Sequence, residues 1–190
     1  MSKDVPRKIM DATMEVIANK KISGTRMNLI AQEADMTQSN LHYYFPTKND
    51  VLNAVLDDMQ EKFSENRKKA VDTAHKGMEE NLHAILEEKK DGILHNKKLD
   101  YVQFDYWVQG TVDESVRKSF QRNFNIWRKD IREILEKGGY NADNERAKML
   151  PYLLVSVMMG ASMQYLIDEG SFDLDTYFSE AEKLILEAMK

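Results

Sequence analysis

The stretch that decides the fold is "ADMTQSNLHYYFPTKND", from Ala34 to Asp50. It places amides and hydroxyls directly beside a group of aromatic residues and then meets a proline. On a helical wheel of about 100° per residue, Leu41, Tyr44 and Phe45 share one side. Ser39 and Tyr43 point directly away from that side, flanked by Asn40 and His42, and Gln38 projects from the first turn. These two faces predict a short helix that is anchored by its aromatic side and presents its polar side to a partner.

A second short helix is predicted directly before it, over residues 27–34, with a tight turn between the two. Asp35 lies in that turn, where a left-handed backbone is expected and aspartate is one of the few tolerated residues. Thr37 is predicted to cap the helix over 38–44, and Thr25 to cap the preceding one. Two short helices joined in this way indicate a helix-turn-helix, whose second helix enters the DNA major groove.

The polar side of the second helix has the chemistry of a DNA reader. Glutamine and asparagine amides can pair with adenine, and serine can contact several base edges. Thr37, Tyr43 and Lys48 suit phosphates, which fix position without reading sequence. The helix N-termini at Thr37 and Thr47 add backbone amides for the same phosphate oxygens. A solvated polar face that reads nothing is an equally good interpretation of the wheel alone.

Composition excludes several classes of protein. The 190 residues are 42% hydrophobic and 31% charged, as is ordinary for a soluble globular protein. There is no cysteine, so disulfides and thiolate metal sites are excluded. The charged N-terminus lacks the apolar core of a signal peptide. The net charge is -5, with +1 over residues 1–50 and -6 over the rest. Charge alone therefore does not indicate a nucleic-acid partner.

One apolar run, "MLPYLLVSVMMGASMQYLI", has about the length of a membrane span. It contains Pro151, Ser156, Ser162 and Gln164, and acidic residues follow it at once. These features favour a buried helix, so no membrane partner is expected.

Most of the chain shows apolar residues at three- and four-residue spacing, which is typical of amphipathic helices. Helices are predicted at about 6–20, 27–34, 38–44, 48–75, 79–94, 98–110, 114–137, 143–168 and 174–189. The predicted fold is all-α with about nine helices. An N-terminal three-helix DNA-binding module with the helix-turn-helix, residues 1–47, is expected on a larger C-terminal helical bundle, residues 48–190.

The segment "GTRMNLIAQEADMTQSNLHYYFPTKNDVLNAVL" resembles the DNA-binding module of the tetracycline-repressor (TetR) family of bacterial regulators. The matching features are "IAQEA" and "LHYYFPTKNDVL", and the resemblance covers residues 6–56. It implies a homodimer, a palindromic operator of double-stranded DNA and a C-terminal domain that binds a small-molecule effector. It also implies a recognition helix over Gln38–Tyr44. The residues predicted to contact DNA are Thr25, Asn28, Thr37, Gln38, Ser39, Asn40, His42, Tyr43 and Lys48.

The end of the chain, "GASMQYLIDEGSFDLDTYFSEAEKLILEAM", is similar to a C-terminal variant of the family in which the last two helices pair with a second subunit. Its wide apolar stripes favour a four-helix dimer interface, and alanines in them permit close approach. The predicted interface residues are Leu154, Ala161, Tyr165, Phe178, Ala181 and Ile185. The alternative is that these faces only close the core of the monomer.

Aromatic and methionine residues predict a pocket for a hydrophobic or aromatic effector. Methionine provides an adaptable apolar wall. The predicted pocket residues are Tyr101, Phe104, Trp107, Phe124, Trp127, Met158 and Met159. The alternative is a filled core, because aromatic stripes at helical spacing usually pack inside.

The sequence contains no motif that indicates catalysis. Glu80 and His83 have a di-iron spacing but no second copy on another helix. There is no glycine-rich phosphate loop. No catalytic residue, metal or cofactor is therefore expected. The favoured interpretation is a cytoplasmic, homodimeric, ligand-responsive transcriptional repressor. The alternative is a helical small-molecule-binding or scaffold protein with a vestigial DNA module.

Overall fold

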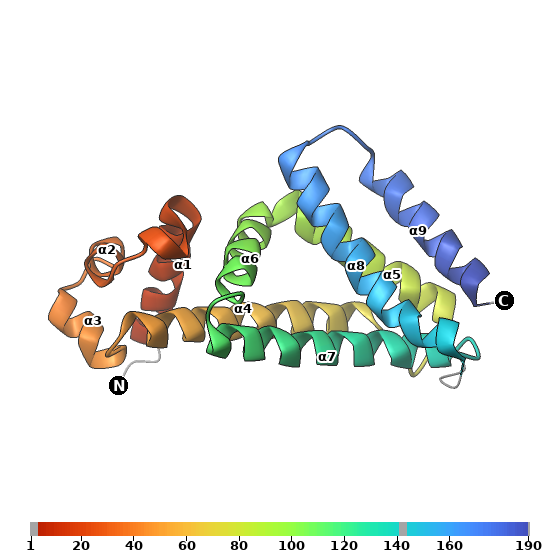
Figure 1. The fold of residues 1–190 in the computed structure, drawn as a ribbon, viewed down its shortest axis with the longest axis horizontal. Helices are drawn as coiled ribbons and strands as arrows, with labels where there is room; N and C mark the ends of the chain where they lie inside the picture. Colours follow the sequence, from red (N-terminus) through yellow and green to blue (C-terminus); the bar gives the residue numbers. More distant parts are fainter. Residues whose placement is uncertain (1–3, 141–143, 190) are drawn as a thin grey trace. The chain divides into compact units, whose positions relative to one another are not determined.

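The computed structural model describes residues 4–140 and 144–189. Every regular element in these two ranges is an α-helix, which confirms the all-α prediction. The helices are α1 Asp4–Gly24, α2 Met27–Glu33, α3 Gln38–Tyr44, α4 Lys48–Ala70, α5 Met78–His95, α6 Lys97–Gln109, α7 Glu114–Glu136, α8 Glu145–Ile167 and α9 Leu174–Ala188 (Figure 1). The start of α8 predicted at 143 lies outside the described residues, as do residues 1–3 of the predicted module.

The chain divides into two compact units. The first contains the residues up to Lys62 together with Lys98–Gln121, and the second contains Phe63–Lys97 together with the chain from Arg122 onward. The long helices α4 and α7 each contribute to both units. The first unit thus includes α6, which lies far beyond the predicted boundary at 47/48. That boundary stays a prediction about which residues bind DNA.

The core of the first unit is built by α1, α2, α3 and the start of α4. Its buried residues are Ile9, Val16, Ile30, Ala31, Leu41 and Val51. Tyr44 and Phe45 are partly buried against this cluster, which confirms that the aromatic side of α3 is its anchor. Burial of these side chains fixes the orientation of a helix that is too short to be stable alone.

Helix α6 is attached to this unit by polar contacts with α1 and α4. The Asp105 carboxylate accepts from the Ile22 backbone N–H, directly after a break in α1 at Lys21, where φ is 62°. The buried Tyr106 hydroxyl donates to the Leu52 carbonyl at 2.8 Å. Lys98 forms an ion pair with Glu15. Residues of α6 therefore hold the end of α1 and the first turns of α4.

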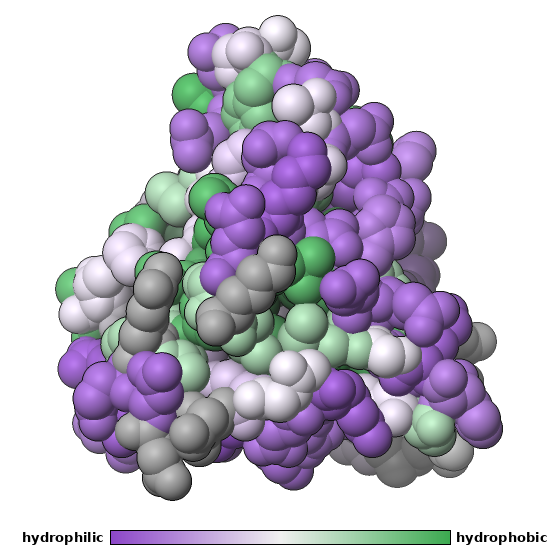
Figure 2. Space-filling model, turned by 90° about the vertical axis from the view of Figure 1, so that its right-hand side faces the viewer, coloured by the Kyte–Doolittle hydropathy of each residue, from purple (hydrophilic) through white to green (hydrophobic). Residues whose placement is uncertain are grey.

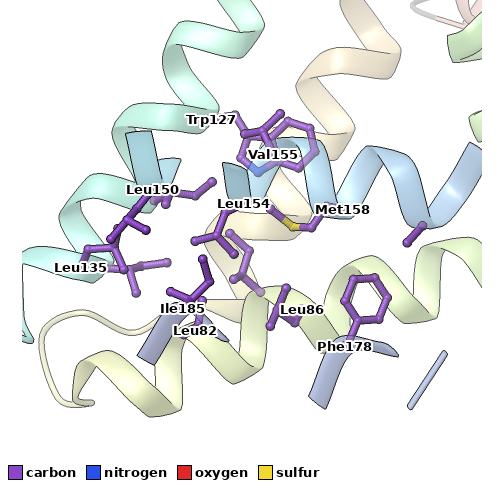
Figure 3. Close-up of a cluster of buried hydrophobic side chains, with 14 of the residues drawn as sticks. Leu82, Leu86, Trp127, Leu135, Leu150, Leu154, Val155, Met158, Phe178 and Ile185 are labelled. Atoms are coloured by element: carbon purple, nitrogen blue, oxygen red, sulfur yellow. The ribbon is translucent and has the colours of Figure 1, made fainter. Parts of the chain in front are cut away.

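The core of the second unit brings together α5, α7, α8 and α9. In Figure 3 the side chains of Leu82, Trp127, Leu154, Met158 and Phe178 lie close together, and all five are buried. Helices α8 and α9 run side by side (Figure 1). The apolar stripes of these two helices thus face their own monomer.

Helix α4 ends at Ala70, five residues before the predicted end near His75. The cause is Asn81, a fully buried residue of α5. Its Oδ1 accepts from the Asp72 backbone N–H at 2.7 Å, and its Nδ2 donates to the Gly77 carbonyl at 2.9 Å. A buried amide must be satisfied, and the segment after α4 turns around it to do so.

The stretch Ala147–Ile167 of α8 is long and apolar enough to cross a membrane, judged by length and composition alone. One such helix is weak evidence for a span, because the core helix of a globular protein has the same character. Leu150, Leu154 and Met158 on this helix are buried in the core of the second unit.

Candidate nucleic-acid interface

Helix α3 is held at both ends by local hydrogen bonds. The Thr37 hydroxyl accepts from the Asn40 backbone N–H at 3.2 Å, which confirms Thr37 as the N-cap. At the other end, the Phe45 N–H donates to the Leu41 carbonyl at 2.9 Å. Asp35 has φ of 48°, which confirms the left-handed turn before the helix. These contacts present α3 in one fixed orientation.

The polar side of α3 faces solvent as predicted, with Gln38, Ser39, Asn40, His42 and Tyr43 all exposed. Tyr43 is 69% exposed, and its ring packs edge-on against Tyr44 with centroids 5.1 Å apart. His42 Nδ1 lies 2.9 Å from the Pro46 carbonyl, which can only accept, so Nδ1 donates. In the neutral ring Nε2 then accepts from Gln38 Nε2, 3.3 Å away. This contact uses one amide hydrogen and leaves the Gln38 carbonyl oxygen to face outward.

Replacing Thr37 with alanine is expected to lower the free energy of unfolding by about 1 kcal/mol, because the Asn40 N–H loses its cap. Chemical denaturation of the purified variant measures this change. Thr37→Ser keeps the hydroxyl and is the matched control. Equal stability of the alanine and serine variants would contradict a capping role.

Thr47 and Asp50 form a reciprocal cap at the start of α4. The Thr47 N–H donates to Asp50 Oδ2 at 2.8 Å, and the Asp50 N–H donates to the Thr47 hydroxyl at 3.2 Å. The backbone amides of this helix start lie beside Pro46 at the end of the α3 segment. The prediction that they contact phosphate stays open to test.

Lys48 is half-buried, and its ammonium donates to the Ile22 carbonyl at 2.7 Å. Burial lowers the pKa of Lys48, and the nearby positive charge of Arg26 lowers it further. The contact ties α4 to the end of α1 and uses one of three ammonium donors. A phosphate contact by Lys48 therefore stays a prediction.

Arg26 is a candidate phosphate contact that the sequence analysis missed. It is exposed and occupies the N-cap position of α2. A basic residue directly before the first helix of a helix-turn-helix was the signal available in the sequence. Asn28, in the first turn of α2, is exposed as the predicted contact requires.

The prediction that Thr25 caps α2 is wrong, and its predicted DNA contact stays a prediction. Its side chain does not cap α2, whose N-cap is Arg26 without a side-chain hydrogen bond. Thr25 is buried, and its hydroxyl donates to the Lys21 carbonyl at 2.8 Å. The same carbonyl, at the break in α1, also accepts from the Thr25 backbone N–H at 3.1 Å, and this pair of hydrogen bonds holds the threonine side chain inward.

The predicted effector-pocket residues are divided between the two units. Trp127 and Met158 are buried in the core of the second unit, with Phe124 and Met159 packed against it. Tyr101, Phe104 and Trp107 lie on α6 in the first unit. Trp107 is half exposed, and the Tyr101 ring lies 6.0 Å from the Lys21 ammonium. For the four residues of the second unit, the filled-core alternative describes the packing.

The predicted dimer-interface residues require a similar correction. Leu154, Ala161, Phe178, Ala181 and Ile185 are buried within the monomer, and Tyr165 is packed against the same cluster. Helices α8 and α9 have two apolar sides each, and the pattern of spacing does not say which side meets the rest of the monomer. The opposite side carries exposed apolar residues, namely Met149, Tyr152, Leu153, Met163, Ile167 and Leu184.

The described residues contain no group of three or more histidine, aspartate or glutamate side chains placed to hold a metal ion. Glu80 and His83 contact other residues and not each other. Glu80 Oε2 accepts from the Gly77 N–H at 3.1 Å at the start of α5, and His83 Nδ1 lies 3.1 Å from Glu182 Oε2.

A capped, exposed α3 that follows a tight turn and is anchored on α1 and α2 defines a helix-turn-helix protein. Residues 9–55 match the model described as "Bacterial regulatory proteins, tetR family". Residues 9–55 thus form a DNA-binding module of the tetR type.

Solved structures share the fold over almost the whole chain. A TetR transcription regulator from Haloarcula marismortui has a TM-score of 0.81 and 22% identity, covering 99% of this chain and 97% of its own. The regulator FadR from Bacillus subtilis in complex with stearoyl-CoA has a TM-score of 0.75 and 16% identity, covering 96% and 98%. A regulator from Saccharomonospora viridis in complex with choline has a TM-score of 0.76 and 20% identity, covering 97% of both. No curated protein matches the sequence.

Proposed function

We propose that this protein is a homodimeric, ligand-responsive transcriptional repressor that reads a palindromic operator in the cytoplasm. The observation that carries the proposal is the polar, exposed side of α3 on an anchored helix. Its Gln38 and Asn40 amides have the donor and acceptor pair that adenine requires in the major groove. Tyr43 and Arg26, both exposed, suit the flanking phosphates.

The dimer is proposed to form through the exposed sides of α8 and α9. One side of α8 carries six positions whose spacing alternates between four and three residues. They are Met149, Leu153, Ser156, Gly160, Met163 and Ile167. This is the spacing of a coiled-coil seam, and all six positions are exposed or half-exposed. Apart from the chain neighbours of Gly160 and the backbone of its own helix, no described residue has an atom within 4 Å of the place where a Cβ would stand on Gly160, so a partner helix can approach closely there.

A groove between α8 and α9 extends this seam. It has a volume of about 640 Å³, and Leu153, Val157 and Leu184 are among its apolar lining residues. Figure 2 shows hydrophobic side chains reaching the surface among hydrophilic ones on the side that it views. A second copy of the chain is the partner that matches a repeating helical seam.

The proposed switch is a change in the separation of the two recognition helices. A dimeric reader needs them about 34–36 Å apart, one turn of DNA. The contacts of α6 with α1 and α4, through Asp105 and Tyr106, support α4 and α6 as the route to the DNA-binding module. A small-molecule effector that binds more tightly to a dimer whose recognition helices do not match the DNA spacing would release the operator. The operator affinity would fall only by the ratio of the effector's affinities for the two forms of the dimer. The stearoyl-CoA and choline complexes of proteins with this fold support an effector of this kind.

The experiment that tests the function is a selection of genomic DNA fragments with purified protein, followed by titration against salt. A palindromic site is expected, and its affinity should fall steeply with salt. With about 6–10 phosphate contacts, the loss between 50 and 200 mM salt is about 10³- to 10⁵-fold. Recovery of no enriched sequence would contradict the regulator and favour the helical binding protein.

A further inference from the structure

Near the end of α4, the structure holds a buried cation whose donors are not satisfied. Arg67 is only 5% exposed, and neither its Nε–H nor its Nη2–H group has a hydrogen-bond partner. The guanidinium stacks on the Trp127 ring, with Cζ 4.6 Å from the ring centroid. Stacking orients the planar group but satisfies none of its N–H donors. Buried charged groups without partners are costly, so unmet donors on a buried arginine point to a missing acceptor.

Asp130 lies one helical turn beyond Trp127 on α7. Its Oδ2 is also buried and also lacks a hydrogen-bond partner. Burial raises the pKa of Asp130, while the positive charges of Arg67 and Lys68 oppose that rise. Both residues line one cavity of about 150 Å³, whose apolar walls include Val71, Ile85 and Ile134. The residue that carries two unmet donors and the residue that carries one unmet acceptor therefore line the same small cavity.

We propose that this cavity binds the carboxyl group of a small organic acid, and that this acid is the effector of the proposed regulator. The two carboxyl oxygens accept from Nε–H and Nη2–H of Arg67, in the forked geometry that guanidinium offers to carboxylates. One proton is shared between the ligand and Asp130, so that Asp130 Oδ2 also gains a hydrogen bond. Only the role as effector rests on the proposed function; the binding itself does not.

Charge and size both favour such a ligand. A carboxylate that arrives with one proton adds no net charge beside Arg67 and Asp130, whereas a bare anion would face the Asp130 charge across a small cavity. A cavity of about 150 Å³ can hold a molecule the size of benzene. The acid should therefore have a single ring or a short chain.

The first test is calorimetric titration of the full chain, free of DNA, with benzoate and hexanoate. Benzamide and hexanol are the matched probes without a carboxyl group. One carboxylate per chain is expected to bind, with the amide and the alcohol at least about tenfold weaker, since they lose a charge-assisted hydrogen bond. Equal affinity for acid, amide and alcohol would overturn the proposal, as would no binding of either carboxylate.

Variants assign the contact. Arg67→Met should weaken benzoate binding by about 10- to 150-fold, and Arg67→Lys, which keeps the charge without the fork, should still weaken it. Arg128→Met is the matched control, because Arg128 also stacks on an aromatic ring, with Cζ 4.6 Å from the Tyr152 centroid. Unchanged binding in folded Arg67→Lys would overturn the contact.

The shared proton makes benzoate binding depend on pH, which would not be expected if Asp130 had only a structural role. Because the complex holds one proton more than its separated parts, benzoate affinity should fall by up to about tenfold per pH unit as pH rises. Titrations in buffers of different ionisation enthalpy should show uptake of about one proton. Asp130→Asn supplies a permanent donor, so it should bind benzoate without proton uptake. Proton uptake that persists in Asp130→Asn would overturn the assignment.

Other charged groups around the cavity are Lys68 on α4, Glu88 on α5, and Lys129 and Glu133 on α7. Glu133→Gln is the control for a general electrostatic effect and should keep the proton uptake. A protein that binds its operator but no carboxylate would refute this inference and leave the proposed function standing. A protein that binds benzoate through Arg67 but selects no DNA would refute the proposed function and leave the carboxylate site standing.

Discussion

Substituting glutamate for both Leu153 and Leu184 is expected to convert the protein to a monomer and to weaken operator binding by about 10²- to 10⁴-fold. The two leucines are 53% and 65% exposed and line the groove between α8 and α9. In the proposed dimer each would be buried against the partner, and a buried, unpaired carboxylate strongly opposes association. A monomer binds only one half-site at a time and loses the gain from two linked contacts.

Sedimentation and DNA titration of the double variant measure these two effects. Val112→Glu is the matched control, because Val112 is 78% exposed but lies in the α6–α7 connection and is not a lining residue of the groove. It should leave both the mass and the affinity unchanged. Circular dichroism should show that all variants are folded, since neither leucine belongs to the core cluster. A double variant that stays dimeric would move the interface to another surface.

Gln38→Ala is expected to weaken binding to the selected operator by about 2–6 kcal/mol, or roughly 30- to 10⁴-fold. A good bidentate contact between an amide and adenine contributes about 1–3 kcal/mol of discrimination, and a dimer makes each contact twice. Affinity for unrelated DNA should change little, because the amide contacts base edges. Tyr43→Ala should instead weaken binding to both kinds of DNA, since phosphate contacts carry no sequence information.

Competition titrations with operator and unrelated DNA at one fixed salt concentration separate these outcomes. Gln32→Ala is the control, because Gln32 is an exposed glutamine on α2, outside the polar side of α3. If Gln38→Ala and Tyr43→Ala both leave the operator affinity unchanged, α3 is not the recognition helix.

The helices and the DNA-binding module could be predicted from the order of residues alone. Helix starts and stops depend on neighbours in the chain, and the caps at Thr37 and Thr47 with the turn at Asp35 were all predictable for that reason. The two sides of α3 were predictable because an amphipathic helix has only one side to bury. Thr25 is the exception, because its hydroxyl donates to the Lys21 carbonyl at a break in α1, and no pattern in the neighbouring sequence predicts that break.

Only the tertiary structure decided which side of a doubly apolar helix faces inward. Leu154 and Leu153 are adjacent, equally apolar residues, yet one is fully buried and the other is half exposed. The spacing of apolar residues predicts that a helix has an apolar stripe, but it does not predict which other segment packs against that stripe. The same limit concealed the cavity beside Arg67, because its residues come from α4, α5 and α7. Unmet hydrogen bonds arise from packing between distant segments, and no local pattern in the chain records them.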